Sequence, residues 1–121
     1  MRDLILIGYW KSDDAPGWPD PRDLVDLEWD SEDRDAVAQY LETGLVSRAY
    51  MGFSPCRICG ADNGNLEFTD LTYVWPSGLA HYVRDHGVRL PAEFVDHATT
   101  TQEAVEQSGR DESWWRIQGT E

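Results

Sequence analysis

The stretch that decides the fold runs from position 55 to position 86 and reads PCRICGADNGNLEFTDLTYVWPSGLAHYVRDH. Within it, Cys56 and Cys59 begin the pattern C-x2-C-x21-H-x4-H, which His81 and His86 complete. These are the chain's two cysteines and two of its three histidines. Thiolates and imidazoles in pairs are the usual ligands of tetrahedral zinc. The pattern therefore predicts one structural Zn²⁺ bound by all four side chains.

The spacing of the two histidines constrains this prediction. A helix turns about 100° per residue, so a separation of five places His81 and His86 about 140° apart on an ideal helix. They converge only if the helix ends or loosens near His86, and Gly87 favours such an end. Two alternative ligand sets stay open, in which His97 or Asp85 replaces one of the histidines.

Local patterns predict an α+β fold, with a small antiparallel sheet, three or four helices and one structural zinc site. Apolar runs and turn residues predict a buried strand over 3–10, a strand over 45–53, and a hairpin of 66–69 with 72–75. Capping residues predict helices from Asp30 or Ser31 to about Thr43, over 77–86, from Pro91, and near 101–107 after a Thr100–Glu103 capping box. If the tail is a strand, Trp114 and Trp115 point to opposite faces.

Length and charge restrict the classes of partner. The 121 residues suit a single domain, 1–121, that contains the zinc-binding segment 55–87. A net charge of −13 repels nucleic-acid phosphates and anionic membranes, and it favours a basic partner protein. No apolar run approaches the ~20 residues that span a bilayer, and the N-terminal run is too short for a signal peptide. We therefore expect a cytoplasmic protein, in which C-x-x-C spacing favours metal or redox chemistry over a disulfide.

The first third of the chain combines acidic residues with tryptophans. Trp18 and Trp29 alternate with carboxylates at positions 13, 14, 20, 28, 30, 32, 33 and 35. One interpretation is a solvated loop followed by a helix start whose dipole favours negative charge. The other is a docking surface, with aromatic anchors and an acidic rim, for a basic protein.

The segment resembles a two-Cys, two-His zinc finger, and the hairpin between the ligand pairs also resembles a treble clef. The resemblance covers about 31 residues and implies Cys56, Cys59, His81 and His86 as ligands. The central spacing of 21, against about 12 in DNA-reading fingers, and the acidic composition argue against DNA binding. The run WPSGLAHYVRDHGVRLP resembles small uncharacterised bacterial proteins, which implies a bacterial cytoplasmic setting.

Two enzyme classes share part of the pattern. Zinc deaminases carry H-x-E before P-C-x-x-C, but no histidine precedes His81 here. Thioredoxin-like proteins place C-x-x-C at the start of a helix, and the glycines and asparagine that follow Cys59 oppose one. We therefore favour a non-catalytic interaction or regulatory module over an acidic inhibitor or immunity-type protein, and over a metal-dependent enzyme. An open metal position beside a carboxylate such as Glu67 or Asp85 would favour the enzyme.

Overall fold

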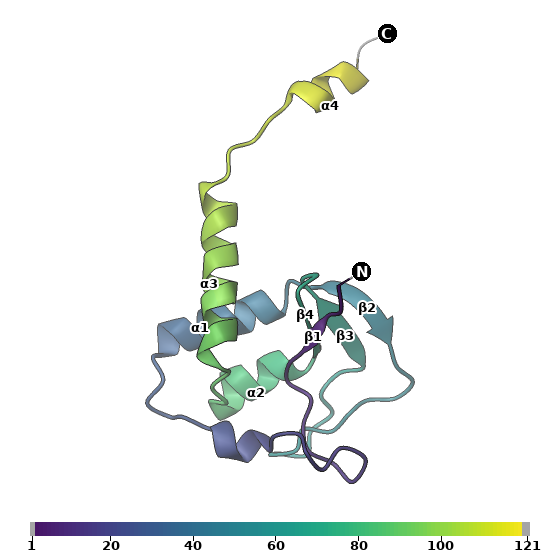
Figure 1. Cartoon of the computed structure of the whole chain (residues 1–121), viewed down its shortest axis with the longest axis vertical. Coiled ribbons are helices and arrows are strands. Elements are labelled where there is room, and N and C mark those ends of the chain that lie inside the picture. The colour runs from purple at the N-terminus through teal and green to yellow at the C-terminus, as the bar shows by residue number, and fades with distance from the viewer. Residues whose placement is uncertain (1, 120–121) are drawn as a thin grey trace.

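The computed structural model describes residues 2–119, so positions 1, 120 and 121 of the predicted domain and tail lie outside it. Its described part contains a four-stranded sheet and four α-helices (Figure 1). The elements, in chain order, are β1 (Ile5–Leu6), the 3-10 helix η1 (Pro21–Leu24), α1 (Ser31–Leu41), β2 (Leu45–Ala49), β3 (Leu66–Thr69), β4 (Tyr73–Pro76), α2 (Leu79–His86), α3 (Ala92–Gln107) and α4 (Ser113–Gln118). The predicted α+β class is confirmed.

The β3–β4 hairpin lies at the centre of the sheet, whose strand order is β1-β4-β3-β2. The Asp70 carboxylate accepts hydrogen bonds from the backbone N–H groups of Thr72 (2.9 Å) and Tyr73 (2.7 Å), which closes the turn. β2 pairs antiparallel with β3, but β1 pairs parallel with β4. The sheet is therefore mixed, whereas the sequence predicted an antiparallel one, because the N-terminal run lies beside β4 in the same direction.

The N-terminal strand is shorter and more exposed than predicted. Only Ile5–Leu6 is a strand, and these side chains are 53% and 55% exposed. β1 lies at the edge of the sheet, and Gly8 follows with a φ of +79° that takes the backbone out of the extended region. The prediction of a buried strand over 3–10 was wrong for this reason.

α1 begins, and α2 ends, where local chemistry predicts. Asp30 caps α1 by accepting a hydrogen bond from the Glu32 backbone N–H at 2.9 Å. α2 ends at Gly87, which adopts the left-handed conformation with φ of +64°. His86 is thus the last residue of α2, as the predicted convergence of the histidines requires.

The C-terminal helices differ from the prediction. A single helix, α3, replaces the two that were expected after Pro91. Thr101, in the region of the expected break, instead donates its hydroxyl to the His97 carbonyl one turn earlier, at 2.8 Å. Trp114 and Trp115 lie in the helix α4, not in a strand, and α4 stands apart from the sheet (Figure 1).

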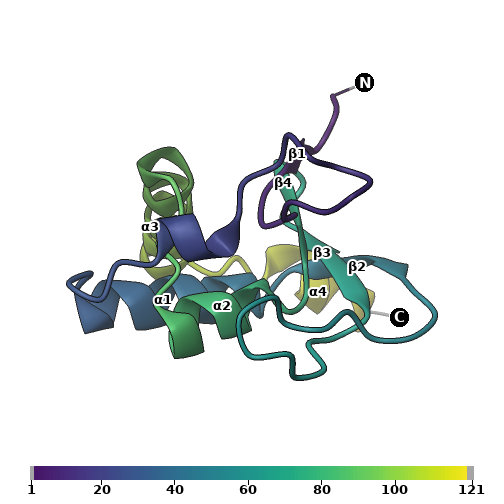
Figure 2. The same ribbon diagram turned by 90° about the horizontal axis from the view of Figure 1, so that it is seen from below.

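The core lies between the sheet and the helices. Trp75 of β4, Leu41 of α1, Phe94 of α3 and the α2 residues Leu79 and Val83 are almost completely buried. The Trp75 indole N–H donates to the Leu41 carbonyl at 2.9 Å, which ties the sheet to the end of α1. α1 and α2 lie side by side in both views (Figure 2). No helix within 2–119 is long and apolar enough to cross a membrane.

Candidate metal centre

The two cysteines lie on a tight turn that the backbone defines. The segments that enter and leave the turn are joined by hydrogen bonds from Tyr50 N–H to the Asn65 carbonyl and from Cys56 N–H to the Ala61 carbonyl, both 2.8 Å. Gly60 N–H donates to the Cys56 carbonyl at 2.8 Å, and Gly60 has a φ of +76° that favours glycine. We call residues 55–62, closed by the Pro55–Asp62 bridge, the knuckle.

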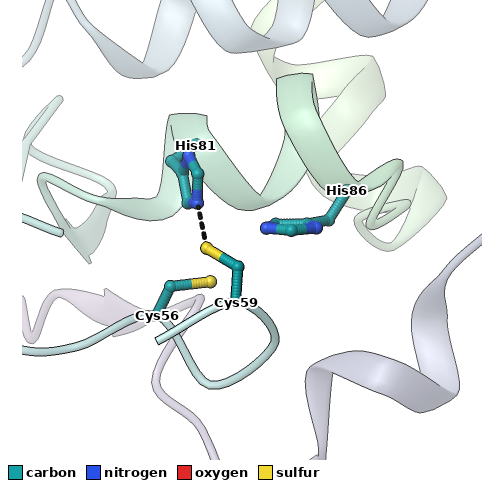
Figure 3. A group of neighbouring side chains, drawn as sticks. All are labelled: Cys56, Cys59, His81 and His86. Atoms are coloured by element: carbon teal, nitrogen blue, oxygen red, sulfur yellow. Dashed lines mark hydrogen bonds between the residues drawn. The ribbon is translucent and has the colours of Figure 1, made fainter. Parts of the chain in front are cut away.

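The knuckle and α2 bring the four predicted side chains together. One ligand atom from each of Cys56, Cys59, His81 and His86 lies within 4.8 Å of the other three (Figure 3). Tetrahedral zinc, with Zn–S of about 2.3 Å and Zn–N of about 2.0–2.1 Å, separates its ligand atoms by about 3.3–3.8 Å. The Cys59 Sγ and His81 Nε2 atoms are already 3.5 Å apart. A modest inward movement of the other atoms would complete a tetrahedron.

His81 is oriented by a carboxylate on the next turn of α2. Its Nδ1 lies 2.7 Å from Oδ2 of Asp85, while its Nε2 faces the Cys59 sulfur. A proton on Nδ1 that is shared with Asp85 leaves Nε2 as a lone-pair donor. Histidine ligands of metals commonly make such a hydrogen bond through the other ring nitrogen.

His86 has a buried ring nitrogen without a partner. Its Nε2 makes no hydrogen bond to any residue in 2–119 and is shielded from solvent. The ring reaches from the end of α2 toward the two sulfurs (Figure 3) and lies 4.9 Å from the His81 ring, almost perpendicular to it. Buried polar atoms rarely remain unsatisfied, so this nitrogen fits a ligand that the protein residues do not supply.

The two thiols have different surroundings. Cys56 is buried and Cys59 is exposed. Burial raises the pKa of Cys56, but hydrogen bonds from the backbone N–H groups of Cys59 and Ile58 outweigh it, so the pKa of Cys56 lies below its usual value. The Ile58 N–H donates to the Cys56 sulfur at 3.4 Å. Such N–H groups support a thiolate, the form that binds metal.

Both alternative ligands have other partners. Asp85 holds His81 from outside the cluster. His97 lies on α3, where its Nε2 is 2.8 Å from Oδ2 of Asp70 and its ring packs 5.0 Å from Tyr73. Within residues 2–119, the cluster that could hold a metal ion therefore consists of the four side chains that the spacing predicted.

One contact that supports the site has no signal in the sequence. The Tyr82 hydroxyl accepts a hydrogen bond from the Arg57 backbone N–H at 2.7 Å, which ties the knuckle to α2. Trp10 packs edge-on against Tyr82, with ring centroids 5.4 Å apart. Arg57 and Tyr82 are 25 positions apart, and no spacing rule pairs a tyrosine with a backbone amide over that distance.

Comparison with protein-family models, curated proteins and solved structures finds no match to this chain. The interpretation of the site therefore rests on its donor atoms and their geometry.

Proposed function

We propose that the protein is a non-catalytic, zinc-stabilised module that binds another protein. The observation that carries the proposal is the unpartnered, buried Nε2 of His86, which points into a cluster with two sulfurs and a carboxylate-oriented His81. Two thiolates and two imidazoles suit zinc better than magnesium or calcium, which prefer oxygen ligands.

The donor set supports a structural role for the metal. Catalytic zinc usually keeps three protein ligands and leaves the fourth position for water, whereas structural zinc is closed by four. The two carboxylates that the enzyme alternative would use, Asp85 and Glu67, have other partners. Asp85 pairs with His81, and Glu67 accepts hydrogen bonds from Tyr9 and Ser47 on the sheet.

The structural role has a direct test. Thermal unfolding, followed by circular dichroism, should shift to lower temperature after a strong chelator removes the metal, and zinc should restore it. The reason is that metal-binding free energy contributes to folding when the unfolded chain has no preformed site. A melting curve that is the same with and without chelator would refute a structural zinc.

Charge supports a basic partner and argues against nucleic acid. With a net charge of −13, the chain should bind no duplex DNA at physiological salt, despite the finger-like ligand order. An electrophoretic mobility shift at that salt would contradict this. The resemblance to small bacterial proteins and the C-x-x-C pair support a reducing bacterial cytoplasm as the setting.

A further inference from the structure

A hollow with a volume of about 590 Å³ lies beside the knuckle. Three segments line it: the loop that follows β1, the knuckle with the chain on both sides of it, and the turn from β4 into α2. Its volume is within the range of ligand pockets, about 300–1,000 Å³. We call it the knuckle pocket, and the cysteines and histidines of the metal centre are not among its lining residues.

The pocket has aromatic walls at two depths. Trp10 and Tyr82 are buried beneath it, at 8% and 4% exposure. Trp18 and Tyr50 are 43% and 48% exposed, and Tyr9 packs against Trp18 with ring centroids 5.8 Å apart and tilted by 60°. Exposed aromatic rings that converge on a hollow are unusual for a solvated loop, since they leave apolar surface in water.

The electrostatics of these walls favour a cation. Aromatic faces carry partial negative charge and attract ammonium and guanidinium groups. The Tyr9 hydroxyl donates to Oε1 of Glu67 at 2.5 Å, and burial together with this carboxylate raises the pKa of Tyr9. Donation to a carboxylate increases the electron density of the ring. Arg48 lies 3.7 Å from Glu67 but is largely in solvent, so it offsets only part of that charge.

Two charged side chains line the pocket itself, and they offset each other. Asp14 supplies a carboxylate and Arg57 a guanidinium, whose Nη1 donates to the Lys11 carbonyl at 3.4 Å. The surrounding charge then decides which ligand is favoured. With Asp+Glu at 23 against Lys+Arg at 10, the long-range field attracts cations and repels anions.

We propose that the knuckle pocket receives a lysine or arginine side chain from the partner protein. The inference rests on the proposed function, because it names the surface and the chemistry by which the module recognises a basic protein. It also assigns a role to Trp18, as one wall of a cation-binding pocket.

The metal centre and the pocket share a structural wall. Arg57 lies one residue after Cys56, and its backbone N–H donates to the Tyr82 hydroxyl at 2.7 Å. On the other side, the Asn65 side-chain amide donates to the Tyr50 carbonyl at 3.2 Å. A metal that closes the knuckle therefore holds the wall that contains Tyr50 and Arg57. Removing it should weaken binding in the pocket.

The test uses the full, zinc-supplemented chain and five-residue probe peptides, acetyl-Gly-Gly-X-Gly-Gly-amide, titrated by NMR. X is lysine, arginine, norleucine or glutamate, so norleucine matches the lysine chain without its charge. We expect the two cationic peptides to bind, and the norleucine and glutamate peptides to bind at least tenfold more weakly. Equal binding of the norleucine peptide, preference for glutamate, or no binding of any peptide at millimolar concentration would overturn the proposal.

Variants that keep the net charge of the chain distinguish binding in the pocket from general attraction of cationic peptides to an acidic protein. Trp18→Ala should lower the affinity for the cationic peptides by about threefold to thirtyfold, the range for a cation–π contact. Trp114→Ala, in the exposed helix α4, is the matched control and should bind as the parent does. If both variants bind equally, the pocket is not the site.

Metal content measured on the same samples distinguishes the two proposals. If the chain contains no zinc but still binds the cationic peptides more tightly than the other two, the pocket is supported and the zinc-stabilised module is refuted. A chain with zinc that fails to discriminate among the peptides would refute the pocket alone.

Discussion

Two histidine–carboxylate pairs lie in different regions of this molecule. In the candidate metal centre, Nδ1 of His81 is 2.7 Å from Oδ2 of Asp85. In the packing between α3 and the sheet, Nε2 of His97 is 2.8 Å from Oδ2 of Asp70. As local hydrogen bonds, the two are nearly the same. The difference lies in what surrounds each pair.

The pair at Asp70 is part of a closed network of protein groups. Asp70 also accepts a hydrogen bond from the Tyr40 hydroxyl at 2.5 Å, and the His97 ring packs against Tyr73 and Phe94. The pair at Asp85 leaves Nε2 of His81 facing a sulfur, 3.5 Å away. A carboxylate partner alone therefore does not distinguish a histidine that could hold a metal. The sulfur that faces the other ring nitrogen of His81 does distinguish it from His97.

The largest expected effect comes from Cys59→Ser. Because Cys59 is exposed, this change in a metal-free protein would alter the free energy of unfolding by no more than about 0.5 kcal/mol. If zinc is structural, the substitution removes one of its ligands and should lower the melting temperature markedly. The control is the parent chain with chelator, which should melt close to the variant. If the variant has the same melting temperature as the untreated parent, the Cys59 thiol is dispensable for stability.

Alanine substitutions at His81 and at His97 should have different effects in the two regions. His81→Ala should abolish stoichiometric zinc binding, because it removes a ligand from the cluster. His97→Ala should keep the metal and lose about 1–3 kcal/mol of stability, because Asp70 loses a partner and the packed ring leaves a space. Elemental analysis and denaturant unfolding measure the two effects. Loss of zinc in both variants would mean that His97 also acts on the site.

The carboxylates sharpen the comparison further. Asp85→Asn should reduce zinc affinity by about tenfold to a hundredfold, the usual effect of losing the group that orients a histidine ligand. Asp70→Asn should leave zinc affinity unchanged and destabilise the chain. Competition with a chromogenic chelator measures the zinc affinities. Equal zinc affinities in the two variants would show that Asp85 does not orient His81 for metal binding.

The smallest effect is a pH dependence. Burial raises the pKa of Asp70, but hydrogen bonds from Tyr40 and the backbone outweigh it, so its folded pKa lies below the usual 3.8. A depressed carboxylate pKa stabilises the fold above the unfolded value, and this contribution disappears as pH falls through the folded one. Protons should displace zinc at a higher pH than the one at which Asp70 is protonated, since free imidazole and thiol have pKa values of about 6.5 and 8.5.

These two steps should be separable in an acid titration of the chain. Zinc release should come first and should occur at the same pH in Asp70→Asn. The loss of stability below about pH 4 should be smaller in that variant than in the parent. If the variant and the parent lose stability in parallel, the carboxylate of Asp70 does not contribute as described.

The sequence predicted the parts of this molecule that depend on local chemistry. The Cys and His spacing with Gly87 predicted the cluster, and Asp30 predicted the start of α1. The continuous α3 was missed because three successive threonines are poor helix formers and Thr100 could serve as a cap. In the fold, the Thr101 hydroxyl bonds to the His97 carbonyl and the Gln102 side chain bonds to the Ala36 carbonyl of α1, and the helix continues.

Features that depend on distant residues could not be predicted in the same way. The bond between Arg57 and Tyr82 and the aromatic walls of the knuckle pocket join segments that are far apart in the chain. The exposure of β1 depends on its place at the sheet edge, which its apolar run does not reveal. Each of these arises from tertiary packing.

X-ray absorption at the zinc edge, with elemental analysis of the same freshly purified chain, tests the central claim most directly. We expect about one zinc per chain, with two sulfur ligands at about 2.3 Å and two nitrogen ligands at about 2.0–2.1 Å. A chain without metal, whose two thiols both react freely and which takes up no added zinc, would contradict the account.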